Sequence, residues 1–377
     1  MPGKLNKFSI KGFKSIRELN DFEVKKLNVL IGANGAGKSN FIQIFRMLGS
    51  MCQKNFKKFI DTRGGADNFL HNGPKETESI KAEFEFESGS QYAEGTNKYR
   101  FDLSPTLDGD FVIEESRQYS DRAWRSYGSS SEESKLVDKK DEKSACGQWN
   151  GVGHFVYKSI NSWKVYHFHD TSETAPMRRF CSIYDNVKLR EDASNLAPFL
   201  LKLREEEHLK SYYKDIVNAV SLVTPFFEKF LLTTVKRGEE EQVRLDWKQK
   251  GSDFPMQPYH LSDGSIRFIC LAAALLQPTP PSIIVIDEPE LGLHPGAIAI
   301  LAELIETTSD QTQVIVSTQS AELINYFALE DIVVVNRKGG QSTFERLNED
   351  DYSVWLEDYN IGELWTKNVI AGGPSFE

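Results

Sequence analysis

The stretch IGANGAGKSNF, residues 31–41, lies between an apolar run and a segment whose apolar residues have helical spacing. It matches the pattern G-x-x-x-x-G-K-[ST], which ends at Lys38 and Ser39. Glycines allow backbone N–H groups to turn inward around phosphate oxygens, and the start of the following helix adds a partial positive charge. The stretch therefore predicts a nucleotide-binding loop made by Gly32, Ala33, Asn34, Gly35, Ala36, Gly37, Lys38, Ser39 and Asn40.

Two side chains of this loop have specific roles in such sites. Lys38 would bridge the β- and γ-phosphates, and Ser39 would bind Mg²⁺. An ordinary glycine-rich turn that caps a helix is the alternative. By average composition, the pattern arises by chance in about one per cent of chains of this length. The flanking apolar strand and amphipathic helix favour the phosphate-binding interpretation.

A second candidate site follows an apolar run near the C-terminal end. The sequence SIIVIDEPE, residues 282–290, predicts a buried strand with Asp287 and Glu288 at its carboxyl end, where ligands bind in α/β sheets. Asp287 is placed to hold Mg²⁺ through water, and Glu288 is placed to orient or deprotonate the attacking water. Acids at a strand end can also simply face solvent, but a phosphate loop in the same chain favours the catalytic interpretation.

A third motif, LSDGS at residues 261–265, opens a predicted helix with Ser262 or Asp263 as its cap. Between a phosphate loop and a pair of acids, it resembles the signature motif LSGGQ of ABC-type ATPases. The stretches FSIKGFKSIRELNDFEVKKLNVLIGANGAGKSN and IDEPELGLHP are similar to the group that contains SMC, RecF, RecN and the ATPase half of OLD-family nucleases. Compact stand-alone bacterial predicted AAA-family ATPases of this group are most similar. The resemblance covers residues 4–75 and 255–335.

The resemblance implies that two ATP molecules, each with Mg²⁺, are held between two head-to-tail copies of the chain. Ser262, Asp263 and Gly264 would then contact the γ-phosphate bound by the second copy. His294 falls where the family has its D-loop aspartate, at the dimer interface, although a surface turn is an equal alternative.

Two departures from the family pattern concern hydrolysis. Gln319 stands where such ATPases carry a switch histidine. Glutamine can hydrogen-bond a γ-phosphate but cannot carry a positive charge, so we expect catalysis by Lys38, Glu288 and Gln319 to be slow or differently gated. No residue is assignable as the family's Q-loop glutamine, because Gln53 is upstream of the expected place.

The chain as a whole predicts an α/β fold. Strands that alternate with helices after residue 260 predict a parallel sheet, and the segments before residue 116 predict short strands, including antiparallel neighbours. The family resemblance makes this an ABC-type head, with a mixed core sheet and an antiparallel β-subdomain. No heptad pattern is sustained between residues 105 and 255, which excludes a long coiled coil.

We divide the sequence into four parts. They are an N-terminal lobe with the phosphate loop (residues 1–116), a polar, serine-rich insert expected to be a mobile loop (117–150), a middle region with a helical lid (151–254), and a C-terminal lobe with the signature, acid and switch motifs (255–377).

The middle region contains the stretch WKVYHFHDTSETAPMRR, residues 163–179. His167 and His169 are expected on one face of a strand and could form a metal pair, although no further ligand follows at a recognisable spacing. The stretch could instead close the first lobe or contact nucleotide or a partner. The basic pairs at residues 57–58 and 178–179 could touch nucleic acid, but short basic clusters are more often solvated.

Composition limits the partners and the compartment. The chain has 377 residues and a formal net charge of −10, which argues against coating nucleic acid by charge alone. The four cysteines are far apart and predict free thiols in the cytoplasm, without a disulfide framework or a zinc site. No stretch reaches 18 apolar residues, so we expect no membrane partner.

The favoured function is an ATP-driven dimerisation switch that hydrolyses ATP. By family resemblance, it would be read by DNA or by a separately encoded effector such as a nuclease, in DNA repair or in defence against phage. The chain is not expected to carry a nuclease of its own. The alternatives are the ATPase subunit of a membrane transporter and a nucleotide-dependent binding module with little turnover.

Overall fold

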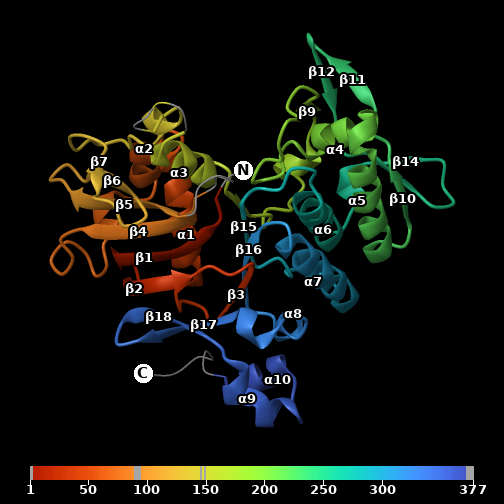
Figure 1. The fold of residues 1–377 in the computed structure, drawn as a ribbon. Helices are drawn as coiled ribbons and strands as arrows, with labels where there is room; N and C mark the ends of the chain where they lie inside the picture. The colour runs from red at the N-terminus through yellow and green to blue at the C-terminus, as the bar shows by residue number, and fades with distance from the viewer. Residues whose placement is uncertain (1–2, 89–94, 145–146, 148–149, 371–377) are drawn as a thin grey trace.

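The computed structural model describes residues 3–88, 95–144, 147 and 150–370. Its centre is a six-stranded sheet with the order β18-β17-β3-β16-β15-β8 (Figure 1). All neighbouring strands are parallel except β17 and β18, which are antiparallel. The parallel sheet predicted after residue 260 is therefore confirmed. The strands are β3 (Leu27–Ile31), β8 (Lys164–Tyr166), β15 (Ile283–Asp287), β16 (Gln313–Thr318), β17 (Ile332–Lys338) and β18 (Gln341–Arg346).

Both faces of the central sheet are buried, because alternate residues of its strands enter two separate hydrophobic cores. In β15, Ile283 and Val285 belong to one core, and Ile284 and Ile286 belong to the other. Continuous apolar strands of this kind are typical of a parallel sheet covered on both sides. The first core also contains helix α1 (Lys38–Met51), and the second contains α6 (Asp263–Leu275) and α7 (Pro295–Ser309).

A second six-stranded sheet, with the order β2-β1-β4-β5-β6-β7, forms the antiparallel β-subdomain. Its strand β4 alternates buried and more exposed side chains, as expected for a sheet with one solvated face. Helices α2 (Phe56–Asp61) and α3 (Val152–Ile160) belong to the same side of the molecule (Figure 1). The strands are β1 (Leu5–Phe13), β2 (Ile16–Glu23), β4 (Ile80–Glu87), β5 (Thr96–Pro105), β6 (Phe111–Tyr119) and β7 (Arg125–Ser126).

Residues 117–150 differ from the mobile surface loop that their composition predicted. β6 continues into this segment, β7 pairs with β6, and Leu136 is fully buried. The carboxylate of Glu115 accepts hydrogen bonds from Ser134 Oγ (2.7 Å) and from the backbone N–H of Lys135 (2.6 Å). Polar anchors of this kind are not visible in composition, and they join the segment to the N-terminal lobe. Residues 145–146 and 148–149, which include Cys146, lie outside the described residues.

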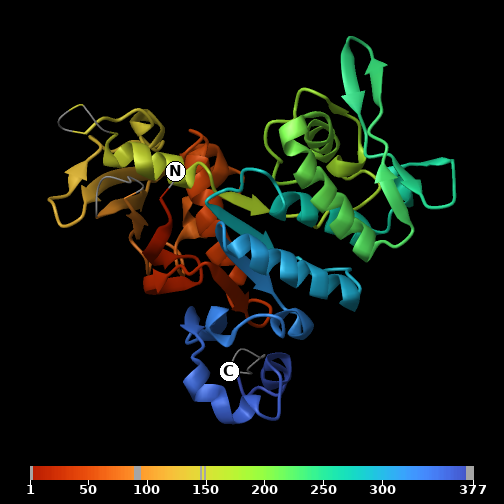
Figure 2. The same cartoon turned by 45° about the vertical axis from the view of Figure 1, so that its right-hand side comes forward.

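The predicted helical lid is present as α4 (Leu196–Glu205) and α5 (Lys210–Val223), which pack against α6. Figure 2 shows the lid and the β-subdomain on opposite sides of the central sheet, with the β11–β12 hairpin projecting from the lid. The longest helix of the described chain, α7, has 15 residues, so the expected absence of a long coiled coil holds for the described residues. The small strands beside the lid are β9 (Cys181–Ser182), β10 (Phe227–Phe230), β11 (Thr234–Arg237), β12 (Glu240–Val243), β13 (Trp247–Gln249) and β14 (Pro255–Met256).

Three short helices belong to the C-terminal part of the described chain: α8 (Ala321–Ile324) precedes β17, and α9 (Glu349–Leu356) and α10 (Ile361–Thr366) follow β18. No helix in the described part of the chain combines the length and apolarity needed to cross a membrane. Cys52, Cys181 and Cys270 are free thiols.

Candidate functional site

The glycine-rich loop connects β3 to α1, and Lys38 is the first residue of that helix. Lys38 Nζ donates to the backbone oxygens of Gly32 (2.6 Å) and Ala33 (3.3 Å). Burial lowers the pKa of Lys38, whereas Glu288 and Asp287 act in the opposite direction. The ammonium group is thus held inside the loop and faces two carboxylates.

Gly37 shows why this loop needs glycine. Its φ of 120° lies in the region that side chains disfavour, and a Cβ there would overlap the hydroxyl of Ser342. Ser342 Oγ donates to the backbone oxygen of Ala36 (2.5 Å), which fixes the loop against β18. Asn40 is fixed in a similar way, because its Nδ2 donates to Ser15 Oγ (2.7 Å).

The motifs predicted from separate parts of the sequence meet at one edge of the central sheet. Ile31 at the end of β3 pairs with Thr318 of β16, and Asp287 at the end of β15 pairs with Ser317. Because the carboxyl ends of parallel strands share an edge, their loops converge. They enclose a cavity of about 190 Å³ lined by Ala33, Asn34, Gly35, Gly37, Lys38, Ser39, Asn40, Asp287, Glu288, Ser317 and Gln319.

Glu288 has an unusual backbone, with a φ of 46°. This left-handed conformation costs a non-glycine residue on the order of 1 kcal/mol. A hydrogen bond from its N–H to the carbonyl of Ser317 (2.7 Å) holds it in place. Gln319 Nε2 donates to Glu288 Oε1, so the candidate switch residue directly contacts the candidate catalytic carboxylate.

Two further residues of this site were not singled out in the sequence. Glu290 is buried, and its Oε1 accepts from Thr318 Oγ1 (2.6 Å) and from the N–H of Gln319 (3.2 Å). Burial raises the pKa of Glu290. Ser317 lines the cavity, and its buried hydroxyl has no hydrogen-bond partner among the described residues. In the sequence, Glu290 is the second glutamate of DEPE (residues 287–290), and Ser317 lies at the polar end of VIVST (residues 314–318). These two positions could have indicated that both residues belong to the site.

The donors of this cavity fit a nucleotide with Mg²⁺. Ser39 and Asp287 supply a hydroxyl and a carboxylate oxygen to the same cavity, and Mg²⁺ in phosphate sites takes one or two protein oxygens besides phosphate and water. Helix α1 begins at Lys38 in the lining of the same cavity, and the first backbone N–H groups of a helix have no partner within the helix and can bind phosphate oxygens. Gly32 and Ala36 shape the loop but are not part of the cavity lining.

His167 and His169 lie after β8 rather than on one face of it, since β8 ends at Tyr166. Their ring centroids are 3.9 Å apart, and His169 Nε2 lies 3.1 Å from the backbone oxygen of Asp287. Burial lowers the pKa of His167, and His169 and Arg46 lower it further. Within the described ranges, no group of three or more His, Cys, Asp or Glu residues is arranged to hold a metal ion. Of the two histidines, His169 therefore contacts the acid site, at the backbone oxygen of Asp287.

The signature residues lie outside this cavity. Ser262 caps α6, with its Oγ accepting from the N–H of Ser265 (3.1 Å), as the sequence predicted. Ser262 and Asp263 are exposed, and neither they nor Gly264 line the cavity of their own chain. A Cβ on Gly264 would overlap the backbone oxygen of Gly292, which shows how closely α6 approaches the turn after the acids.

Two buried arginines, Arg178 and Arg267, fix the beginning of α6 to neighbouring segments. Arg178 donates to the carboxylate of Asp263 (3.2 Å) and to the carbonyl of Pro258. Because it is buried, this residue neither faces solvent, as the sequence favoured, nor is open to nucleic acid, which was the alternative. Arg267 Nε donates to the carbonyl of Phe168 (3.0 Å), the residue between the two histidines.

His294 caps α7, with its Nδ1 accepting from the N–H of Gly296 (3.2 Å). It is exposed and does not line the cavity. This placement is compatible with both the D-loop role and the surface turn, so the dimer contact stays a prediction.

Comparison with known proteins shows which family this chain belongs to. A family model described as "AAA domain, putative AbiEii toxin, Type IV TA system" matches residues 27–325. The chain belongs to this family. No curated protein matches the chain.

Solved structures with a similar fold include SMC heads. One, bound to the C-winged helix domain of ScpA, has a TM-score of 0.62 at 16% identity and covers 93% of this chain and 99% of its own. Another, with an extended coiled coil and bound to the C-terminal domain of ScpA derived from Pyrococcus furiosus, has a TM-score of 0.58 at 15% identity, with 94% and 99% coverage. These likenesses concern the fold, and together with the family they confirm an ABC-type, SMC-like AAA ATPase head.

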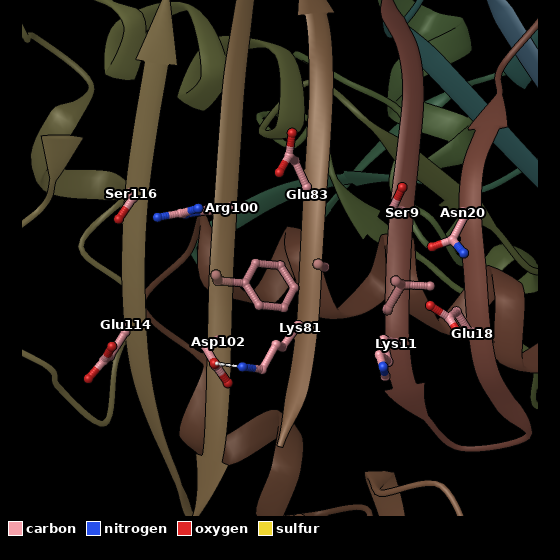
Figure 3. A pocket seen from close by; sticks show the side chains of 13 residues that line it. Ser9, Lys11, Glu18, Asn20, Lys81, Glu83, Arg100, Asp102, Glu114 and Ser116 are labelled. Carbon is pink, nitrogen blue, oxygen red and sulfur yellow. Dashed lines mark ion pairs between the residues drawn. The ribbon is translucent and has the colours of Figure 1, made fainter. Parts of the chain in front are cut away.

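A larger hollow of about 470 Å³ lies on the outer face of the β-subdomain. Figure 3 shows side chains of both signs along its strands, and Lys81 pairs with Asp102 (3.0 Å). This is the solvated face of an antiparallel sheet. The chemistry that a nucleotide requires is concentrated in the smaller cavity instead.

Proposed function

We propose that this AAA-family chain binds ATP with Mg²⁺ in the cavity between β3, β15 and β16 and hydrolyses it. The observation that carries the proposal is the convergence of Lys38, Ser39, Asp287 and Glu288 on that one cavity. Lys38 would neutralise charge on the β- and γ-phosphates, and Ser39 and Asp287 would hold Mg²⁺. Bound Mg²⁺ would supply further positive charge at the phosphate oxygens.

Glu288 would accept the proton of the attacking water. Its carboxylate is oriented by the amide of Gln319, and the backbone of Gln319 is in turn held by Glu290. A general base must be fixed within hydrogen-bond reach of the proton it removes. In this chain a glutamine supplies that orientation without a charge of its own, which favours slow turnover that a partner stimulates.

We further propose that ATP closes a head-to-tail homodimer. Ser262, Asp263 and Gly264 are positioned rigidly but lie outside the cavity of their own chain. A second copy would bring these residues to the γ-phosphate. Opening and closing of this dimer would then act on DNA or on a separately encoded effector such as a nuclease, in DNA repair or in defence against phage.

Phosphate release tests the hydrolysis proposal. Wild-type protein should release phosphate from ATP, with or without added DNA, and Glu288→Gln should abolish release while it retains bound ATP. Light scattering should show a dimer for Glu288→Gln at saturating ATP. ATP binding without turnover under every condition would instead support a binding module with little turnover, which the glutamine at position 319 also fits. A monomer at saturating ATP would contradict the dimer.

A further inference from the structure

A third hollow, of about 370 Å³, lies beside the C-terminal half of α1 and shares no lining residue with the phosphate cavity. Its apolar floor includes Phe45 and Trp163, whose ring centroids are 5.3 Å apart. Its volume falls in the range of about 300–1,000 Å³ that is usual for small-molecule sites. The polar side chains that line it include Arg46, Gln53, Asn55, Arg63, Asn161 and His167.

Two guanidinium groups converge on this hollow. Arg63 lies over the ring of Phe59, 4.0 Å from its centroid. Burial lowers the pKa of Arg63, and the neighbouring Arg46 lowers it further. Among the described residues no carboxylate lies within ion-pair distance of either arginine, and Arg63 Nη1 donates to two uncharged groups, the carbonyl of Phe59 and the hydroxyl of Thr62 (3.3 Å each). Two nearby cations without a counter-ion repel each other, and an anion between them would relieve that repulsion.

The carboxylates at the rim of the hollow have partners of their own. Glu191 lies 3.5 Å from Lys164 Nζ, and Asp192 accepts from the N–H of Ser194 (3.0 Å). Both acids are exposed. Arg46 and Arg63 therefore have no carboxylate partner in this lining, and an anion that entered the hollow could bind between them.

We propose that this hollow binds a nucleoside 5′-phosphate unit, either as a free mononucleotide or as the phosphorylated end of a nucleic-acid strand. The guanidinium group is a planar, bidentate partner for phosphate. The amides of Gln53, Asn55 and Asn161 offer donors and acceptors of the kind that recognise a base edge. A base would stack against an arginine or an aromatic ring of the lining.

The hollow has a short physical connection to the acid site. His167 lines the hollow and packs on His169, which contacts the backbone of Asp287. A ligand against His167 would therefore influence the position of Asp287 and regulate turnover. This regulatory consequence rests on the proposed ATPase activity, whereas binding to the hollow does not.

Binding is tested on the full-length Lys38→Ala variant, which lacks the lysine proposed for the β- and γ-phosphates. Calorimetry with AMP, with a 5′-phosphorylated oligodeoxythymidine and with its 5′-hydroxyl counterpart separates the sources. AMP binding indicates a free nucleotide, binding of the phosphorylated oligonucleotide indicates a strand end, and either supports the proposal. The 5′-hydroxyl oligonucleotide should bind at least about tenfold more weakly than its phosphorylated form, because charge-assisted bonds to phosphate are lost.

The arginines are tested in the same Lys38→Ala background. Arg46→Gln and Arg63→Gln should each weaken binding about tenfold or more. Lys58→Gln, at an exposed lysine of α2 outside the hollow, should leave binding unchanged. Thermal unfolding confirms that each variant is folded. Failure of both phosphorylated probes to bind, or equal binding after the arginine substitutions, overturns the proposal. Neither result depends on hydrolysis, so the ATPase proposal would stand.

Discussion

The phosphate cavity and the signature turn differ in how complete they are within one chain. In the cavity, strands from distant parts of the sequence bring a lysine, two acids and a glutamine together. At the signature turn, Ser262 and Asp263 are exposed at a fixed helix start and contact nothing in that cavity. This fixed and exposed helix start is the basis of the proposed contact with a second copy. The comparison thus separates the residues that meet within one chain from those that the proposed dimer would bring in.

Among substitutions outside the phosphate cavity, Ser262→Asp should have the largest effect. Aspartate also caps helices well, so the fold should be kept, but its charge would repel the γ-phosphate of the partner's ATP. We expect turnover to fall about 100-fold, the usual cost of losing one transition-state donor, while each chain still binds ATP. Phosphate release and ATP titration measure the two quantities. Normal turnover would show that the signature turn takes no part.

Gly264→Ala tests how closely α6 must approach the turn at Gly292. The added Cβ would overlap a backbone oxygen, and overpacking of this kind costs about 2 kcal/mol. We expect a lower urea midpoint of unfolding for Gly264→Ala than for wild type. Gly296→Ala is the matched control. A Cβ at residue 296 would meet only His294 Nδ1, at 3.7 Å. Equal midpoints for both variants would contradict the account.

Gln319→Ala removes the amide that holds the carboxylate of Glu288. A hydrogen bond to a charged group contributes about 1.5 kcal/mol, which corresponds to roughly a tenfold loss of kcat. ATP affinity should change less than kcat, because the contact orients the base rather than the nucleotide. Gln311→Ala, at an exposed site before β16, should leave both constants unaltered. Loss of affinity without loss of kcat would assign Gln319 to nucleotide binding instead.

Glu290→Gln should have the smallest effect, on the pH dependence of stability. Because burial raises the pKa of Glu290, the folded state holds this proton more tightly than the unfolded state does. The resulting stability is complete below the ordinary pKa of glutamate and is lost as pH rises through the raised pKa.

Chemical unfolding at several pH values measures this effect. As pH rises above about 4, the free energy of unfolding of Glu290→Gln should increase relative to that of wild type. Glu303→Gln, on the exposed face of α7, should show no such trend. A difference between wild type and Glu290→Gln that does not vary with pH would contradict the account.

The sequence predicts the parts of the site that depend on local pattern. The loop around Lys38, the acids after β15 and the cap at Ser262 are each contained in a short stretch, so spacing alone places them. The parallel strands follow from continuous apolar runs such as residues 283–286. From these features, the fold class and the residues of the candidate cavity could be predicted.

Features that depend on tertiary packing were not predictable. His169 contacts Asp287 only because β8 pairs with β15, and no local sequence pattern predicts that pairing. Arg46 lies in α1 and Arg63 in the turn after α2, and the two line one hollow only in the folded chain. Residues 117–150 were expected to be mobile from their composition, yet Glu115 anchors this segment at Ser134 and Lys135 through hydrogen bonds. The proposed role of the signature residues at a second copy's ATP would depend on an assembly that one chain does not contain.

Mixing two inactive variants tests the two-chain site most directly. Lys38→Ala should disable the phosphate loop, and Ser262→Asp should disable the signature turn, so each homodimer should be inactive. In an equal mixture, half of the dimers should pair the variants and contain one intact site, which predicts recovery of about a quarter of wild-type phosphate release. No recovery, in a mixture shown by light scattering to form dimers with ATP, would contradict a site shared between two copies.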